Sequence, residues 1–253
     1  HGSAFITENY EYIIAATLSS VPIPQVDVPI ETYKENFKGT ISMIKVADDG
    51  EMSVDFQILV PGYDYDKAHC GKGPSHGWAF FTSYNTEQEP SLKEINASQN
   101  DKDYIAAVNW KKAAEYVAEG NYTEMPTSYY HNKMDESTQT AVSEVITTVR
   151  VLDPAKCPGV IYYLPTPKSP HGVDVDPTGE YIVGNGKLSA DMSVHSTTKM
   201  LKAIEDKNYE GEVDGIPILN YDAILAGIVK EPGLGPLHTE FDGKGFAYTS
   251  MFI

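Results

Sequence analysis

The stretch PKSPHGVDVDPTGEYIVGNGK, residues 167–187, decides the fold of this chain. His171 stands at the start of a short apolar run, an acidic turn follows at 176–179, and a second apolar run begins at Tyr181. Two short apolar runs joined by a polar turn that contains Pro and Gly are typical of a β-hairpin. The stretch therefore predicts a strand, a tight turn and a second strand, with a histidine at the entry.

The same order of residues occurs again near the C-terminus, in GPLHTEFDGKGFAYTSMFI, residues 235–253. There His238 lies ten positions before Tyr248, which is also the spacing between the histidine and the tyrosine of the first copy. A looser copy opens the chain, where His1 precedes Tyr12 by eleven positions. A histidine thus occupies one place in a repeated strand–turn–strand unit.

Repetition of such a unit favours a β-propeller, whose blades are small antiparallel sheets. Short strands with frequent turns indicate an all-β fold. We predict one partial propeller domain over 1–253, with short helices at 109–120 and 197–206 and polar loops at 121–142 and 207–220. The first residue is His rather than Met and the last residues read as a strand, so we expect truncation at both ends. A β-sandwich is the alternative fold.

The charge balance limits the classes of partner. The 253-residue chain carries 36 acidic and 19 basic side chains, a net charge of −17. This balance argues against nucleic acid and anionic membranes, which need a basic surface, and it is compatible with hard cations such as calcium. No run of roughly 18 apolar residues occurs, so no membrane span is predicted. Cys70 and Cys157 are compatible with one disulfide or with two free thiols.

Three histidines of the repeat form a candidate metal centre. In a propeller the innermost strands of the blades surround the central axis, so His1, His171 and His238 would meet there. Imidazole suits copper, zinc, iron and nickel. The alternative is that each of these histidines makes a structural hydrogen bond between neighbouring strands. The remaining histidines are expected to be solvated or to cap loops: His69, His76, His131 and His195.

An acidic loop between Tyr84 and Asp103 has the composition of a calcium site, with Glu87 and Glu94 along it. It lacks the ligand spacing of an EF-hand. From the spacing alone, a solvated acidic loop is the favoured interpretation.

Four stretches resemble the N-terminal β-propeller domain of nitrous-oxide reductase. The two most specific are 159–190, with SPHG and NGKLS, and 231–253, with EPGLGPLHTEFDGKGFAYTSMFI. The other two are LVPG…GWAFFTSYNTE, residues 59–87, and NWKKAAEYVAEGNYTEM, residues 109–125. The resemblance covers essentially the whole chain and is looser toward the N-terminus.

The resemblance implies part of a periplasmic copper enzyme that reduces nitrous oxide, N2O + 2 e− + 2 H+ → N2 + H2O. It implies a four-copper sulfide cluster at the axis of a seven-bladed propeller, with His1, His171 and His238 matching cluster ligands. In the family, a dinuclear copper site in a cupredoxin domain delivers electrons across a head-to-tail homodimer. A small donor protein, such as a cytochrome c or a cupredoxin, supplies them.

The resemblance also implies a calcium site. Tyr84, Glu87 and Asp103 match its ligands, a backbone carbonyl comes from near Ile95, and Ser169 stands where the family has an asparagine. Serine is a shorter oxygen ligand than asparagine. The resemblance thus favours a functional interpretation of the acidic loop over a solvated one.

The chain departs from the family in what it lacks. The adjacent His-His pair, the remaining cluster histidines and the cupredoxin domain are absent from it, so we expect the fragment alone to be inactive. The runner-up hypothesis is a non-catalytic, calcium-stabilised propeller that acts as a binding module, and a propeller hydrolase is a third. Asp174, Asp176 and Asp242 are candidate outer-shell partners of the histidines, with turn roles as the favoured alternative.

Overall fold

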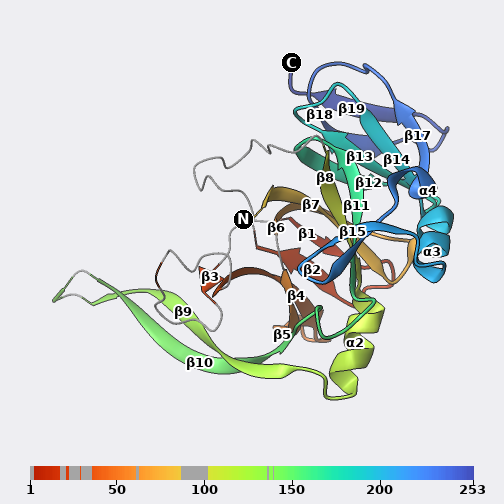
Figure 1. Cartoon of the computed structure of the whole chain (residues 1–253). Helices are drawn as coiled ribbons and strands as arrows, with labels where there is room; N and C mark the ends of the chain where they lie inside the picture. The colour runs from red at the N-terminus through yellow and green to blue at the C-terminus, as the bar shows by residue number, and fades with distance from the viewer. Residues whose placement is uncertain are drawn as a thin grey trace.

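A computed structural model describes residues 3–17, 21–22, 29, 36–60, 63–86, 102–135, 137–138 and 140–253. In this part of the chain β-strands dominate and the helices are short, which confirms the predicted all-β class with short helices (Figure 1). The helices are η2 (Gly73–Ser75), α2 (Trp110–Ala118), α3 (Thr197–Glu205) and α4 (Tyr221–Ile224). None of the helices in these ranges has the length and apolarity to cross a bilayer.

The strands of the described residues form four sheets, whose first strands follow one another along the chain. The first sheet has the order β1-β2-β4-β5-β10-β9, with β3 paired to β4. Its strands are β1 (Ala4–Ile6), β2 (Ile13–Ala16), β3 (Val21–Pro22), β4 (Phe37–Val46), β5 (Met52–Val60), β9 (Thr123–Asp135) and β10 (Thr140–Leu152).

The second sheet has the order β15-β16-β11-β8-β7-β6, the third β12-β13-β14-β17, and the fourth is the hairpin β18-β19. The strands of the second sheet are β6 (Tyr63–Cys70), β7 (Trp78–Thr86), β8 (Lys102–Asn109), β11 (Ile161–Pro167), β15 (Tyr209–Val213) and β16 (Ile216–Leu219). The strands of the third and fourth sheets are β12 (Pro170–Val175), β13 (Tyr181–Gly186), β14 (Met192–Ser196), β17 (Leu225–Val229), β18 (Pro236–Phe241) and β19 (Ala247–Met251). Both hairpins of the repeat, β12-β13 and β18-β19, therefore form as predicted.

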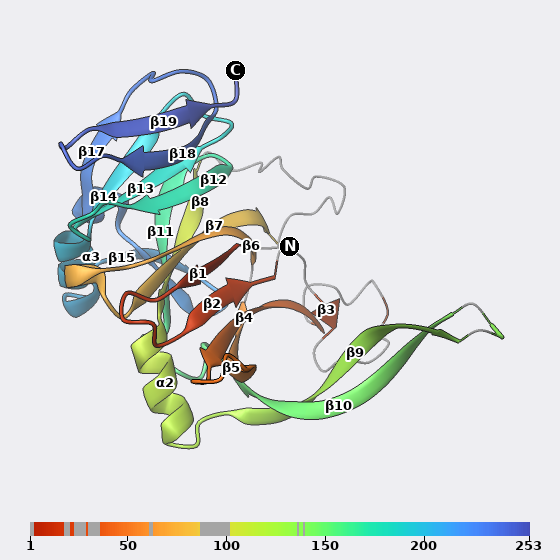
Figure 2. The same ribbon diagram turned by 180° about the vertical axis from the view of Figure 1, so that it is seen from behind.

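The first strands of the four sheets lie next to one another in the order β1, β6, β12 and β18 (Figure 2). The amide of Ser3, just before β1, donates to the carbonyl of Asp66 on β6 at 2.9 Å. The amide of Thr239 on β18 donates to Oδ2 of Asp174 on β12 at 2.7 Å. The chain thus returns to one central row of strands each time it begins a new sheet.

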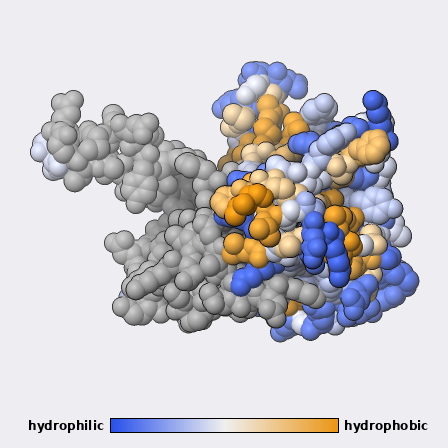
Figure 3. All heavy atoms as spheres, turned by 90° about the horizontal axis from the view of Figure 1, so that it is seen from above, coloured by the Kyte–Doolittle hydropathy of each residue, from blue (hydrophilic) through white to orange (hydrophobic). Residues whose placement is uncertain are grey.

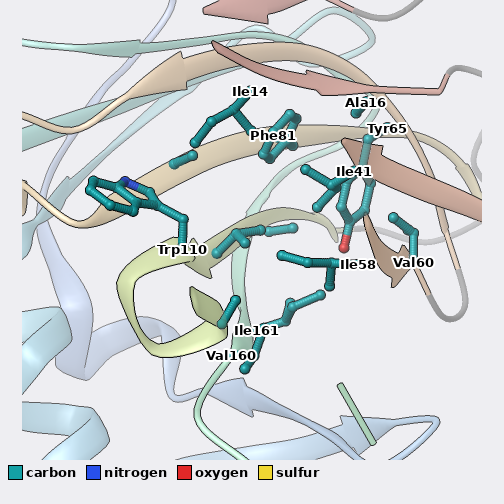
Figure 4. Packing of buried hydrophobic residues seen from close by; sticks show 14 of the residues in the cluster. Ile14, Ala16, Ile41, Ile58, Val60, Tyr65, Phe81, Trp110, Val160 and Ile161 are labelled. Atoms are coloured by element: carbon teal, nitrogen blue, oxygen red, sulfur yellow. The ribbon is translucent and has the colours of Figure 1, made fainter. Parts of the chain in front are cut away.

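Two apolar layers hold the sheets together. Phe80 and Phe81 are neighbours on β7, so they point to opposite faces of the second sheet, and both are fully buried. Phe81 packs in the layer shared with the first sheet, which includes Ile41 and Ile58 (Figure 4). Phe80 packs in the layer shared with the third sheet, which includes Val173. The second sheet is therefore covered on both faces.

The helix predicted over 109–120 forms as α2, because a capping residue at its start and an apolar face both favour a helix there. The Asn109 side chain caps it by accepting a hydrogen bond from the Lys112 amide at 3.0 Å. Its buried residues, at helical spacing, are Trp110, Ala113 and Val117.

Two segments predicted to be polar loops contain strands. Much of 121–142 forms the hairpin β9-β10, whose two long strands pair with each other. Within 207–220, β15 and β16 are joined by Asp214 and Gly215, both with positive φ (49° and 79°). Asp-Gly is a strong signal for a hairpin turn. The acidic residues around it are typical of an exposed loop, and for this reason the hairpin was not predicted.

His195, predicted to be solvated or to cap a loop, is instead fully buried on β14. Its Nε2 lies 3.0 Å from Oγ of Ser193. Burial disfavours the charged ring and lowers the pKa of His195 to about 3. The imidazole is therefore neutral and acts as part of the packed interior.

Replacing His195 with glutamine should remove part of the acid sensitivity of the fold. Unfolded histidine takes up a proton below about pH 6.5, whereas buried His195 stays neutral down to about 3, so wild-type stability falls as the pH drops through this window. Each pH unit removes about 1.4 kcal/mol there. Denaturant unfolding at pH 7.5 and 5.5 should show a smaller acid-induced loss for H195Q than for wild type. Equal losses in the two proteins would contradict this explanation.

Candidate functional site

Two of the three predicted metal-ligating histidines meet in the structure. His171 on β12 and His238 on β18 have ring centroids 5.0 Å apart, with the ring planes at 81°. They come from strands of different sheets that are far apart in the chain. His1 lies outside the described residues, so its predicted place at the site stays a prediction.

The glycine that follows His171 allows this approach of β12 to β18. A Cβ atom at Gly172 would lie 1.9 Å from the carbonyl oxygen of Leu237 and 3.0 Å from the side-chain nitrogen of Asn185. Any larger residue would therefore push β18 away. The pair His171-Gly172 thus serves two purposes, because His171 supplies an imidazole and Gly172 lets His238 come close.

His171 has the electronic state that a metal ligand needs. Burial lowers the pKa of His171, and the neighbouring His238 lowers it further. The Nδ1 atom is buried, and no hydrogen-bond partner reaches it from the part of the chain that the structure describes. A neutral imidazole with a ring nitrogen open to coordination fits a copper ion.

A buried carboxylate joins the two strands behind His238. Oδ1 of Asp174 lies 3.6 Å from Nδ1 of His238 and 3.8 Å from Nδ1 of His69 on β6. Burial alone would raise the pKa of the Asp174 carboxyl, but the contacts with His238 and with the Thr239 amide bring that pKa below its usual value. Asp174 is therefore an ionised group within the site, and the turn role favoured for it is wrong.

The other two aspartates considered as outer-shell partners serve in turns, which confirms the alternative favoured for them. Asp176 accepts hydrogen bonds from the Thr178 and Tyr181 amides at 3.1 and 2.8 Å. Asp242 accepts hydrogen bonds from the amides of residues 244 and 246. Each closes the turn of its own hairpin.

Sequence reasoning missed His69, which was expected to be solvated or to cap a loop. Its ring stacks on Phe5 at 4.8 Å and faces Asp174. The surroundings of His69 in the sequence, YDYDKAHC, contain no copy of the repeat. What distinguishes His69 is its place on β6, the first strand of the second sheet, and the sequence does not show this place because it depends on how the strands pair.

Of the remaining histidines, His76 lies away from this site and the side chain of His131 is outside the residues that the structure describes. His76, expected to be solvated or capping, has its ring nitrogens 3.3 Å from Glu8 and 3.0 Å from Glu11. Cys70 and Cys157 are both buried free thiols, so the disulfide alternative is not realised here.

The structure brings together two of the predicted calcium ligands. The amide of Ser169 donates to Oδ2 of Asp103 at 2.6 Å, and both residues are buried. Glu87 and Ile95 lie outside the described residues, and only the backbone of Tyr84 is described, within β7. Among the residues that are described, no group of three or more His, Cys, Asp or Glu side chains is arranged to hold a metal ion.

Comparison with known proteins identifies distant relatives. No family model matches the chain. It is 28% identical to nitrous-oxide reductase of Pseudomonas fluorescens over 251 residues and 26% identical to that of Stutzerimonas stutzeri over 249, in each case 96% of this chain and 33% of the relative. Nitrous-oxide reductase of Ralstonia nicotianae is 41% identical over 91 residues, 36% of this chain and 12% of the relative.

The chain is therefore distantly related to nitrous-oxide reductase and spans about a third of the length of the first two relatives. Among solved structures, hydrazine synthase from Kuenenia stuttgartiensis aligns with a TM-score of 0.32 and 11% identity, covering 98% of this chain and 80% of that one. A score of this size carries no structural inference.

Proposed function

We propose that this distant relative of nitrous-oxide reductase is part of a copper-dependent enzyme of that type. His171, His238 and His1 bind the catalytic copper cluster. The observation that carries the proposal is the 5.0 Å separation of the His171 and His238 rings, from two strands far apart in the chain. Sequence similarity to a reductase and convergence of the two matching histidines are independent kinds of support.

The four sheets are successive blades of a β-propeller. Three begin with four antiparallel strands in a simple order, β1-β2-β4-β5, β6-β7-β8-β11 and β12-β13-β14-β17. Their first strands lie side by side with β18, as the innermost strands of blades do around an axis. The hairpin β18-β19 is the inner half of a fourth blade.

Apolar surface around the fourth hairpin supports this arrangement. A groove of about 510 Å³ runs between the third sheet and the hairpin, lined by Val183, Val194, Phe241 and Phe246 among others. Tyr248 on β19 is 62% exposed. Figure 3, which looks down on the molecule from the end that carries this hairpin, shows apolar patches among the hydrophilic side chains. Outer strands of a fourth blade would cover such a face.

The residues of the site fit copper. His171 is neutral and its buried Nδ1 has no hydrogen-bond partner from the described residues, and the His238 ring centroid lies 5.0 Å from that of His171. When bound, copper supplies the electrons and the coordination that the inert N2O molecule needs. The chain holds and orients the imidazoles on packed strands, which keeps their positions within a narrow tolerance. In the reaction the N–O bond breaks, N2 leaves, and the oxygen takes two electrons and two protons to become water.

The remaining parts of the proposal follow the resemblance. Calcium is bound by Tyr84, Glu87, Asp103, Ser169 and the carbonyl of Ile95, and the contact of Asp103 with Ser169 supports this set. The enzyme is a periplasmic homodimer. It receives electrons from a small donor protein, a cytochrome c or a cupredoxin, through a cupredoxin domain.

Metal analysis of the full-length protein tests the proposal. We expect several copper ions, acid-labile sulfide and calcium in each polypeptide. Calcium without copper, after expression with copper and the maturation system of a denitrifying host, would instead favour the second candidate, a calcium-stabilised binding module. The buried contact between Asp103 and Ser169 is the observation in favour of that candidate.

A further inference from the structure

We propose that Asp174 is a positioning residue that keeps His238 in the tautomer protonated on Nδ1, so that Nε2 is the nitrogen open to a metal. The same cluster holds His69 in the opposite tautomer, protonated on Nε2. The metal-binding consequence rests on the proposed function, whereas the two tautomers follow from the contacts of the chain itself.

Contacts other than those with the two rings hold the carboxylate of Asp174 in place. Its Oδ2 accepts hydrogen bonds from the Thr239 amide at 2.7 Å and from Nδ2 of Asn185 at 3.2 Å. Asp174 is 7% exposed and Asn185 is fully buried. Thr239 directly follows His238, so the carboxylate holds the backbone of β18 with one oxygen and faces the ring of His238 with the other.

His238 must carry its proton on the nitrogen that faces Asp174. An ionised carboxylate only accepts hydrogen bonds, and its Oδ1 lies 3.6 Å from Nδ1 of His238. A lone pair on Nδ1 would repel the carboxylate, whereas an N–H there is attracted to it. In its neutral form the His238 ring therefore has its proton on Nδ1 and its lone pair on Nε2.

His69 is driven to the other tautomer by a different contact. The amide of Val175 donates to Nδ1 of His69 at 3.4 Å. A ring nitrogen that accepts a hydrogen bond from an amide cannot hold a proton as well, so in its neutral form the His69 ring has its proton on Nε2. The lone pair on Nδ1 of His69 lies 3.8 Å from Oδ1 of Asp174, and the hydrogen bond from the Val175 amide offsets the repulsion between them. The stacking of His69 on Phe5 keeps the ring in this orientation.

The tautomer of His238 decides what the site can bind. A ring nitrogen coordinates a metal through its lone pair, and the partner of the other nitrogen selects which one is free. With Asp174 in place, Nε2 is selected. Without it, nothing among the described residues holds a proton on Nδ1, and His238 is free to present either nitrogen.

Nuclear magnetic resonance tests the two tautomers in the metal-free, full-length protein with ¹⁵N-labelled histidine at mildly alkaline pH. Long-range ¹H–¹⁵N correlations distinguish the protonated from the unprotonated ring nitrogen. We expect His238 protonated on Nδ1 and His69 on Nε2. In Asp174→Ala, His238 should change to a mixture or to protonation on Nε2, while His69 keeps its tautomer because the Val175 amide remains.

A matched control and a copper measurement separate this role from general damage. Asp242→Asn alters a turn carboxylate on the strand pair that carries His238 and should leave both tautomers unchanged. Copper(I) affinity, measured by competition with a chromophoric chelator, should fall about 10–100-fold in Asp174→Ala and stay constant in Asp242→Asn.

The outcomes distinguish this inference from the proposed function. Protonation of His238 on Nε2 in the wild-type protein would overturn the inference without any variant having to fold. Unchanged copper affinity in Asp174→Ala would overturn the positioning role. A wild-type protein with the expected tautomers but no affinity for copper would instead overturn the proposed function and leave the tautomer assignment standing.

Discussion

Replacing His238 with alanine is expected to abolish nitrous-oxide turnover by the full-length protein. The His238 ring lies 5.0 Å from that of His171 and is backed by Asp174, so its removal takes away a proposed metal ligand and leaves a buried carboxylate without one of its two imidazole neighbours. Consumption of nitrous oxide with a reduced dye as the electron donor measures the effect. Copper content per polypeptide, measured on the same sample, should fall with it.

His76→Ala is the matched control for this experiment. His76 is also a partly buried histidine in contact with carboxylates, but those belong to Glu8 and Glu11 and its ring lies against Trp110. It should keep turnover and copper content near the wild-type values. Turnover that survives in His238→Ala, with copper content preserved, would remove His238 from the proposed ligand set.

Replacing Gly172 with alanine is expected to have the largest effect on the fold around the site. The added Cβ would lie 1.9 Å from the Leu237 carbonyl oxygen, a distance at which one of the two strands has to move. Overpacking of this kind costs about 3 kcal/mol. Because Leu237 precedes His238, the movement also separates His238 from His171. Denaturant unfolding should show the lost stability, and copper affinity should fall in protein that remains folded.

Gly243→Ala provides the comparison, since this glycine belongs to the turn between β18 and β19 and a Cβ there meets nothing within 4 Å. Its effect on the free energy of unfolding should stay within about 0.5 kcal/mol. If Gly172→Ala were as mild as Gly243→Ala, close contact between β12 and β18 would not be what holds the two histidines together.

Much of the local structure was predictable because its causes are local. The hairpins β12-β13 and β18-β19 form where apolar runs flank the turns closed by Asp176 and Asp242. Helices α2 and α3 form where apolar residues recur at helical spacing behind an Asn or Ser cap. The strands within 207–220 were not predicted although Asp214-Gly215 is typical of a hairpin turn, because the acidic residues of that segment are also typical of an exposed loop.

The candidate site was predictable only in part. The equal spacing in the two repeats pointed to His171 and His238, and these two rings do meet. No spacing pointed to His69, and none distinguished Asp174 from Asp176, two residues later in the same stretch. Successive residues of a strand project to opposite sides, but which neighbour each one meets depends on the strand that packs beside it. For the same reason the full burial of His195 was not foreseen.

The sequence by itself determined the hairpins β12-β13 and β18-β19 and the helices α2 and α3, and it placed a histidine at the same point of the two hairpins, since these features depend on residues a few positions apart. The tertiary structure alone decided which side chains face one another. The contacts of Asp174 with imidazoles from β6 and β18, and the approach of Leu237 to Gly172, join segments far apart in the chain. Such contacts depend on how whole sheets pack, and no local pattern of residues encodes them.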